Sequence, residues 1–208
     1  PKLHKYDLIL FNNFYHFLEQ KLDINSMSYE KLAHNYICYM KSIQSTGPYS
    51  LLGWSFGGVL AFEISKQLIE TGNEIRSIVM IDSFFGYKTA VNKTNTVLSQ
   101  LNDINYHYNP NSTFLKNIEI SKTNITLFKS TKVIDSSFFS DLVSIKQVQD
   151  MNAIFAYYVK DTLFNNLDYI LSVNDFQIIN MNHDHQSWLK DAQQLDRICS
   201  AITPKIEN

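Results

Sequence analysis

Hydrophobic and polar positions follow two different patterns in the first part of the chain. Short apolar runs without helical spacing occur at 6–11, 49–53 and 75–81, and each has the length of a strand. Between them, apolar residues recur every three or four positions at 27–45 and 57–70, which is the spacing of one buried helix face. We therefore expect the order strand, helix, strand, helix, strand, which favours a parallel sheet covered by helices.

The strand rhythm is lost after Ser83. Residues 86–135 are rich in Asn, Thr and Ser and contain only short apolar clusters, and a longer helix is predicted over about 137–161. These segments interrupt the α/β pattern. We therefore expect a mainly helical and mobile lid over residues 86–150, folded over a site that the core carries.

The α/β pattern returns towards the C-terminus. Strands are predicted at 167–173 and 176–181, and a final helix over about 187–202. The prediction is one α/β domain comprising all 208 residues, with its core at 1–85 and 151–208.

The composition is that of a globular chain, with 45% hydrophobic and 18% charged residues. The net charge of −2 gives no electrostatic basis for binding nucleic acid or an anionic membrane. No apolar run reaches the length of about 18 residues that a membrane span requires. We therefore expect neither nucleic acid nor a membrane as a partner.

The first residues of the chain and its two cysteines indicate the cellular compartment of the protein. The start, PKLHKYDLIL, lacks the apolar length and the cleavage site of a signal peptide. Cys38 and Cys199 fall within helical patterns and read as buried thiols in a reducing compartment. We therefore expect a cytoplasmic protein, and the start at Pro1 without Met suggests a piece of a longer chain.

One motif stands where a predicted strand meets a predicted helix. Gly53-Trp54-Ser55-Phe56-Gly57 has the form G-x-S-x-G, which in this context places a serine hydroxyl at the carboxyl edge of a sheet. Glycines two positions before and after remove side chains that would crowd such a turn. We expect Ser55 to be a nucleophile and the Phe56 backbone N–H to stabilise an oxyanion. The alternative is a glycine-rich turn in which Ser55 caps the helix.

A serine nucleophile needs a base, and the loop MNHDHQSWL at 181–189 offers His183 and His185. Two histidines so close could instead bind a metal, but no cluster of Cys, His or carboxylates elsewhere completes such a site. No supporting pattern surrounds the remaining histidines, which are His4, His16, His34 and His107.

The base needs an acid to orient it, and two aspartates end predicted strands. Asp82 follows 75–81, and Asp175 precedes the strand that leads to the histidine loop. Both would lie at the carboxyl edge of the sheet, and the residues alone leave the choice open. The simpler interpretation of either is a turn aspartate.

Residues 48–85, PYSLLGWSFGGVLAFEISKQLIETGNEIRSIVMIDSFF, closely resemble the thioesterase domains that end nonribosomal peptide synthetases and polyketide synthases. The resemblance implies an α/β-hydrolase fold with a helical lid. It implies that Asp82 is the acid. His185-Gln-Ser-Trp-Leu matches the family's histidine segment, so His185 is implied as the base, while His183 stands at the family's glycine position.

The resemblance also implies an activity. A carrier domain, upstream in the same polypeptide, would deliver a peptidyl or acyl thioester on its phosphopantetheine arm, and Ser55 would attack it. Water or a group on the chain itself would then release the product as an acid or a macrocycle. No cofactor of the domain's own is implied, and no metal. The alternatives are a stand-alone editing (type II) thioesterase, a general ester hydrolase, and a carrier-binding module with impaired catalysis.

The sequence departs from the family pattern in three places. The family begins with an earlier strand and a loop that supplies a second oxyanion N–H, so we expect the first strand or strands of the usual fold to be missing from this chain. The predicted link between 167–173 and 176–181 is shorter than in relatives. The glycine before the catalytic histidine is replaced by His183.

Overall fold

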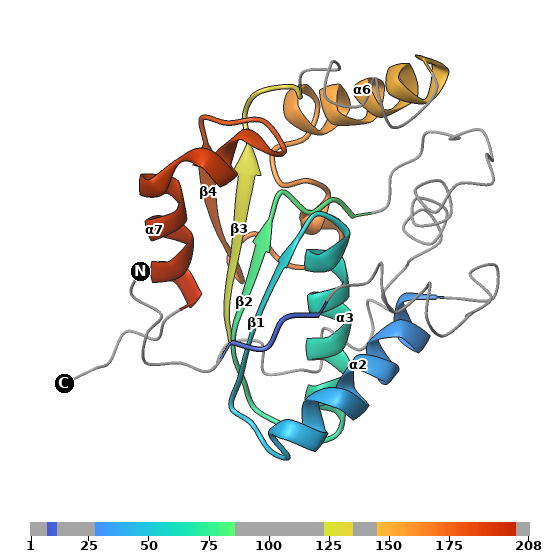
Figure 1. Ribbon diagram of the computed structural model, residues 1–208, viewed down its shortest axis with the longest axis vertical. Coiled ribbons are helices and arrows are strands. Elements are labelled where there is room, and N and C mark those ends of the chain that lie inside the picture. The colour runs from blue at the N-terminus through green and yellow to red at the C-terminus, as the bar shows by residue number, and fades with distance from the viewer. Residues whose placement is uncertain (1–7, 12–27, 86–122, 135–144, 203–208) are drawn as a thin grey trace.

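The computed structural model describes residues 8–11, 28–85, 123–134 and 145–202. Its centre is a parallel four-stranded sheet in which the spatial order of the strands equals their order along the chain (Figure 1). The strands are β1 (Tyr49–Trp54), β2 (Ile75–Ile81), β3 (Asn124–Ser130) and β4 (Gln177–Met181).

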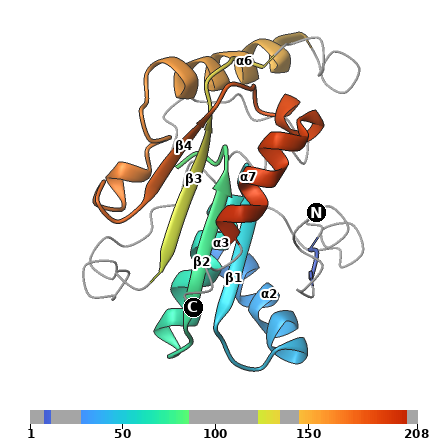
Figure 2. The same cartoon turned by 90° about the vertical axis from the view of Figure 1, so that its left-hand side faces the viewer.

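Helices cover both faces of this sheet, as parallel strands require. The helices α2 and α3 lie on one face and α7 on the other, while α6 lies beyond the carboxyl ends of the strands (Figures 1 and 2). Their bounds are α2 (Tyr29–Ile43), α3 (Phe56–Glu70), α6 (Ile145–Lys160) and α7 (Ala192–Ile202), with short 3₁₀ helices η4 (Leu167–Tyr169) and η5 (Ser187–Lys190).

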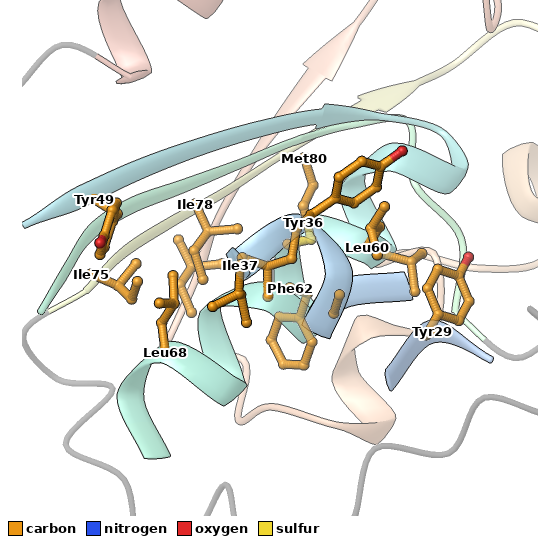
Figure 3. Packing of buried hydrophobic residues seen from close by; sticks show 14 of the residues in the cluster. Tyr29, Tyr36, Ile37, Tyr49, Leu60, Phe62, Leu68, Ile75, Ile78 and Met80 are labelled. Carbon is orange, nitrogen blue, oxygen red and sulfur yellow. The ribbon is translucent and has the colours of Figure 1, made fainter. Parts of the chain in front are cut away.

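The alternation of side chains along β2 divides the core in two. Ile78 and Met80 pack with α2 and α3, and this larger cluster is shown in Figure 3. Val79 and Ile81 face the opposite way and pack with Trp188 and α7. Each fully buried aliphatic side chain of this kind contributes roughly 1.5–3 kcal/mol to folding. The sheet is therefore held rigidly from both sides, and its carboxyl edge is a fixed platform.

Most predicted elements are confirmed by the structure, namely those at 27–45, 49–53, 57–70, 75–81 and 176–181. The helix predicted over 137–161 contains α6, although residues before 145 lie outside the described part of the chain. The final helix is interrupted: η5 ends before Asp191, whose Oδ1 accepts from the N–H groups of Gln193 and Gln194 at the start of α7.

One strand lies where the lid was predicted. Residues 124–130 form β3 in the middle of the sheet, between β2 and β4, so the lid cannot extend through them. The segment ITLF has three apolar residues around Thr126, and all four are buried, as in a strand covered on both faces, but the polar residues in and beside it hide this short signal. At the end of the predicted lid, residues 145–150 are helical and form the start of α6, while 86–122 and 135–144 lie outside the described residues.

The strand predicted at 167–173 is wrong. Asn165 and Asn166 have φ values of 51° and 63°, and this left-handed pair leads into η4 and an irregular segment. Leu167 and Leu171 are buried in the core from one side, which explains their strand-like hydrophobicity. The expected short link between two strands therefore does not exist.

Two further expectations differ from the structure. Residues 8–11, the described part of the strand predicted at 6–11, are exposed and form no strand. Cys38 is exposed and Cys199 is partly exposed, so the interpretation as buried thiols is wrong. Among the described residues, no helix combines the length and the apolar character needed to cross a membrane.

Candidate active site

Ser55 lies at the corner between β1 and α3 in a strained backbone conformation. Its φ is 54° and its ψ is −122°, a combination that costs a non-glycine residue roughly 1–3 kcal/mol. The corner is held because Ser55 N donates to Ile81 O over 2.8 Å, and Ser55 O accepts from Gly58 N over 3.1 Å. The Ser55 side chain makes no capping hydrogen bond to α3, which removes the interpretation of this residue as a helix cap.

Two glycines allow this corner to pack tightly, and only one of them belongs to the G-x-S-x-G motif. A Cβ on Gly53 would lie 2.0 Å from the carbonyl oxygen of Gly57, and a Cβ on Gly58 would lie 1.9 Å from Ser83 Oγ. A Cβ on Gly57 would meet nothing within 4 Å. The expected steric role of the flanking glycines therefore holds for Gly53 and not for Gly57, and Gly58 takes the second place.

Asp82 follows the last residue of β2 and is only 2% exposed. Its φ of 45° turns the chain, and its backbone N–H donates to Phe128 O over 2.7 Å. The carboxylate Oδ1 accepts from Ser130 N over 3.0 Å, and Oδ2 lies 2.7 Å from His185 Nδ1. Burial raises the pKa of Asp82, but the hydrogen bond and charge of His185 and the Ser130 N–H outweigh burial and hold the pKa below its ordinary value.

The His185 loop is fixed by its backbone. Asp184 Oδ1 accepts from Gln186 N and Ser187 N, each over 2.9 Å, which closes a tight turn around the histidine. The indole N–H groups of Trp54 and Trp188 both donate to the carbonyl oxygen of His185, each over 3.0 Å. Because Trp54 immediately precedes Ser55, this pair of bonds joins the histidine loop to the serine corner.

Aromatic rings surround the imidazole of His185, which is 6% exposed. Phe84 stacks on it with ring centroids 5.5 Å apart, and the centroids of Phe155 and Trp54 lie at 4.6 and 5.3 Å. Since Nδ1 faces Asp82, Nε2 is the nitrogen that remains to accept a proton. Within the described part of the chain, no hydrogen bond joins this ring to the Ser55 hydroxyl.

The competing candidates lie elsewhere. His183 Nε2 pairs with Asp191 Oδ2 over 2.8 Å, at the start of α7. Asp175 is exposed in a turn where its backbone N–H donates to Ser172 O. His34 lies on α2. In the described ranges, no three His, Cys, Asp or Glu side chains are grouped so that they could hold a metal ion.

Sequence reasoning missed two residues that contact this site. Lys129 is buried near the end of β3, and Asn165 links it to Asp82. The signal for Lys129 was a charged residue within an apolar strand, ITLFKS, which was not recognised as a strand. No sequence signal marks Asn165, because its role depends on contacts with residues far away in the chain.

A parallel sheet that carries a strained serine corner and a buried Asp–His pair at its carboxyl edge has the architecture of an α/β-hydrolase. The model of the thioesterase domain family matches residues 12–205. The chain therefore belongs to the thioesterase domain family.

The chain is similar to parts of large synthases. It is 32% identical over 204 residues to N-(5-amino-5-carboxypentanoyl)-L-cysteinyl-D-valine synthase of Amycolatopsis lactamdurans. This match covers 96% of this chain and 5% of that protein. It is 32% identical over 128 residues to polyketide synthase PksR of Bacillus subtilis (strain 168), covering 59% of this chain and 5% of that protein. The chain thus spans about 5% of the length of these curated relatives.

Solved structures overlap it more weakly. The NocB thioesterase domain from the nocardicin cluster has 17% identity and a TM-score of 0.49, covering 84% of this chain and 72% of that one. The thioesterase domain SrfTE, described as cyclising the lipopeptide antibiotic surfactin, has 17% identity and a TM-score of 0.44, covering 79% and 70%. Structural similarity at this level does not establish a family, so membership of the thioesterase domain family follows from the sequence matches.

Proposed function

We propose that this chain is a serine thioesterase that releases a peptidyl or acyl chain from the phosphopantetheine arm of a carrier domain. The observation that carries the proposal is the 2.7 Å contact between His185 Nδ1 and Asp82 Oδ2, made beside the strained corner that holds Ser55. Membership of the thioesterase domain family supports the thioester as the bond that is cleaved.

The first half-reaction forms an acyl-enzyme. Ser55 Oγ attacks the thioester carbonyl carbon while His185 Nε2 accepts the hydroxyl proton, and Asp82 holds the imidazole in the required tautomer. Negative charge develops on the carbonyl oxygen, where the Phe56 N–H, in the first turn of α3, can donate to it. When the C–S bond breaks, His185 returns the proton to the departing thiolate.

The second half-reaction releases the chain. A nucleophile attacks the Ser55 ester, His185 takes the nucleophile's proton, and the Ser55 oxygen leaves with a proton from His185. With water as nucleophile the product is an acid, and with an amine or hydroxyl of the chain itself it is a macrocycle. The domain brings no cofactor of its own to either step, because the phosphopantetheine belongs to the carrier.

The test of the nucleophile is labelling by a fluorophosphonate probe followed by intact-mass measurement. The wild-type chain is expected to gain one probe adduct and Ser55→Ala none, with Ser42→Ala, a helix-surface serine, labelled as the wild type. Labelling of the Ser55→Ala variant would contradict the assignment of Ser55 as the nucleophile. Absence of labelling in the wild type would favour a carrier-binding module without catalysis.

The test of the substrate compares one acyl group on a carrier domain, on a short thiol and in a simple ester. The carrier-loaded thioester is expected to have the highest kcat/KM, because binding energy from the carrier positions the reacting carbonyl. Equal values for the three substrates would indicate a general ester hydrolase. Broad release of short, incorrectly loaded acyl groups would indicate an editing thioesterase.

A further inference from the structure

A buried lysine lies next to the Asp82–His185 pair and has no role in the steps above. Lys129, the second-last residue of β3, is only 5% exposed, although lysine is almost never fully buried unless it is paired. Its ammonium donates to the carbonyl oxygen of Tyr158 and to Asn165 Oδ1, the latter over 2.9 Å. Both acceptors are neutral, so a simple ion pair does not explain the position.

Asn165 connects this ammonium to the carboxylate of Asp82. Its Nδ2 donates to Ser83 O over 3.1 Å and lies 3.4 Å from Asp82 Oδ1. An ammonium can only donate, so Oδ1 of the Asn165 amide must face Lys129. The amide nitrogen is thereby directed at Asp82. Lys129 and the Ser83 carbonyl oxygen thus together fix which end of the amide meets the carboxylate.

The second acceptor of Lys129 belongs to α6. Tyr158 lies in the last turn of this helix, where carbonyl groups lack intrahelical partners and a positive charge is favourable. The Tyr158 ring stacks on Phe84 with centroids 4.3 Å apart, and Phe155 of the same helix contacts the His185 ring. The carboxyl end of β3 lies beneath α6 in Figure 2, and the hydrogen bond from Lys129 to the Tyr158 carbonyl oxygen joins the sheet to this helix.

We propose that Lys129 is a positioning residue for the thioesterase reaction: through Asn165 it orients the Asp82 carboxylate, and through the Tyr158 carbonyl it holds α6 against the His185 ring. The catalytic part of this inference rests on the proposed function, whereas the coupling of Lys129 to the Asp82–His185 pair does not.

Electrostatics agree with this assignment. Burial lowers the pKa of the Lys129 ammonium, and the negative charge of Asp82 opposes that change. Desolvating an ammonium is expensive, and an unbranched apolar side chain of similar length would fill the space without that cost. The contribution of Lys129 therefore lies in the orientation that it imposes and not in its packing.

The experiment compares Lys129→Met with Lys132→Met, a matched change at an exposed lysine three residues further along. The first readout is the downfield proton resonance of the His185 Nδ1–H that is hydrogen-bonded to Asp82. It is expected to shift or broaden in Lys129→Met and to remain in Lys132→Met. The second is kcat on a carrier-loaded thioester, expected to fall by about 10²-fold with KM nearly unchanged, as for a misplaced catalytic group.

Asn165→Gly provides an independent variant, since glycine tolerates the φ of 51° at this position. It is expected to show the same change in the resonance, and the Lys129→Met/Asn165→Gly double variant is expected to lose no more kcat than the worse single variant. If Lys129→Met does not fold, Asn165→Gly tests the same contact with Asp82.

The outcomes separate the two proposals. An unchanged resonance and kcat in folded Lys129→Met, a loss confined to thermal stability, or additive losses in the double variant would overturn the role of Lys129. If the wild type cleaves no thioester, the proposed function fails, while the resonance still decides whether Lys129 orients the Asp82–His185 pair.

Discussion

Asp82 Oδ2 and His185 Nδ1 lie 2.7 Å apart, although the residues are 103 positions apart in the chain. The contact spans the sheet from the end of β2 to the loop after β4, and the intervening β3 contributes the Ser130 N–H that holds the other carboxylate oxygen. Both oxygens of Asp82 are therefore engaged without any substrate. The pair is organised in advance, which is what an electrostatic contribution to catalysis requires.

Replacing this acid tests its role directly. Asp82→Asn is expected to lower kcat by about 10⁴-fold, because the amide favours the wrong tautomer of the imidazole. Asp175→Asn, at the exposed turn before β4, is the control and is expected to retain the wild-type rate. Steady-state hydrolysis of a carrier-loaded thioester measures both. A large loss in Asp175→Asn with little change in Asp82→Asn would move the acid to the other strand end.

The two histidines of the loop are expected to separate equally clearly. His185→Gln should abolish turnover and slow fluorophosphonate labelling of Ser55, because no base remains to take the hydroxyl proton. His183→Gln removes only the contact with Asp191 at the start of α7, so it should lower the thermal midpoint and leave the labelling rate intact. Slow labelling in His183→Gln instead would show that the base is misassigned.

The glycines of the serine corner give a prediction about stability. Gly58→Ala should destabilise the fold by about 1–3 kcal/mol, because the new methyl group overlaps Ser83 Oγ in a buried position. Gly57→Ala has open space and should be neutral or stabilising by up to about 1 kcal/mol. Urea unfolding of both variants measures the difference. Equal effects would mean that the corner relaxes away from Ser83.

Asp184 predicts a pH dependence of stability. Burial raises its pKa, but the N–H groups of Gln186 and Ser187 outweigh burial and hold the pKa below its ordinary value. A lowered folded-state pKa stabilises the fold above the ordinary carboxyl pKa, and this contribution is lost as the pH falls through the folded value. Asp184→Asn should therefore be less stable than the wild type near neutral pH, and the difference should vanish in acid. Urea midpoints across this range measure it, and a constant difference would contradict it.

The sequence predicts some residues of this site from local pattern alone and others only through the family resemblance. Ser55 could be placed because its motif, the strand before it and the helix after it are contiguous. Asp82 could be placed at a strand end, but preferring it to Asp175, and His185 to His183, depended on the family resemblance. The structure adds the contact that brings Asp82 and His185 together.

What could not be predicted depends on distant contacts. β3 was hidden because a strand buried on both faces lacks the alternation that marks an exposed one. The strand expected at 167–173 failed because the left-handed backbone of Asn165 and Asn166 leaves no periodic signal. Lys129 and Asn165 are 36 positions apart, so their contact exists only once the sheet and α6 are assembled.

The position of Lys129 in β3 also has a consequence for how the sheet assembles. Phe128, its neighbour, packs on the α7 side with Met181 and Trp188, while Lys129 points to the opposite face. If β3 slipped by one residue during folding, every side chain would change faces, and the ammonium would be directed into that buried hydrophobic cluster and away from the Tyr158 and Asn165 oxygens. The misaligned sheet would be strongly disfavoured. The buried charge of Lys129 would thus help to specify the correct register of β3 in the sheet.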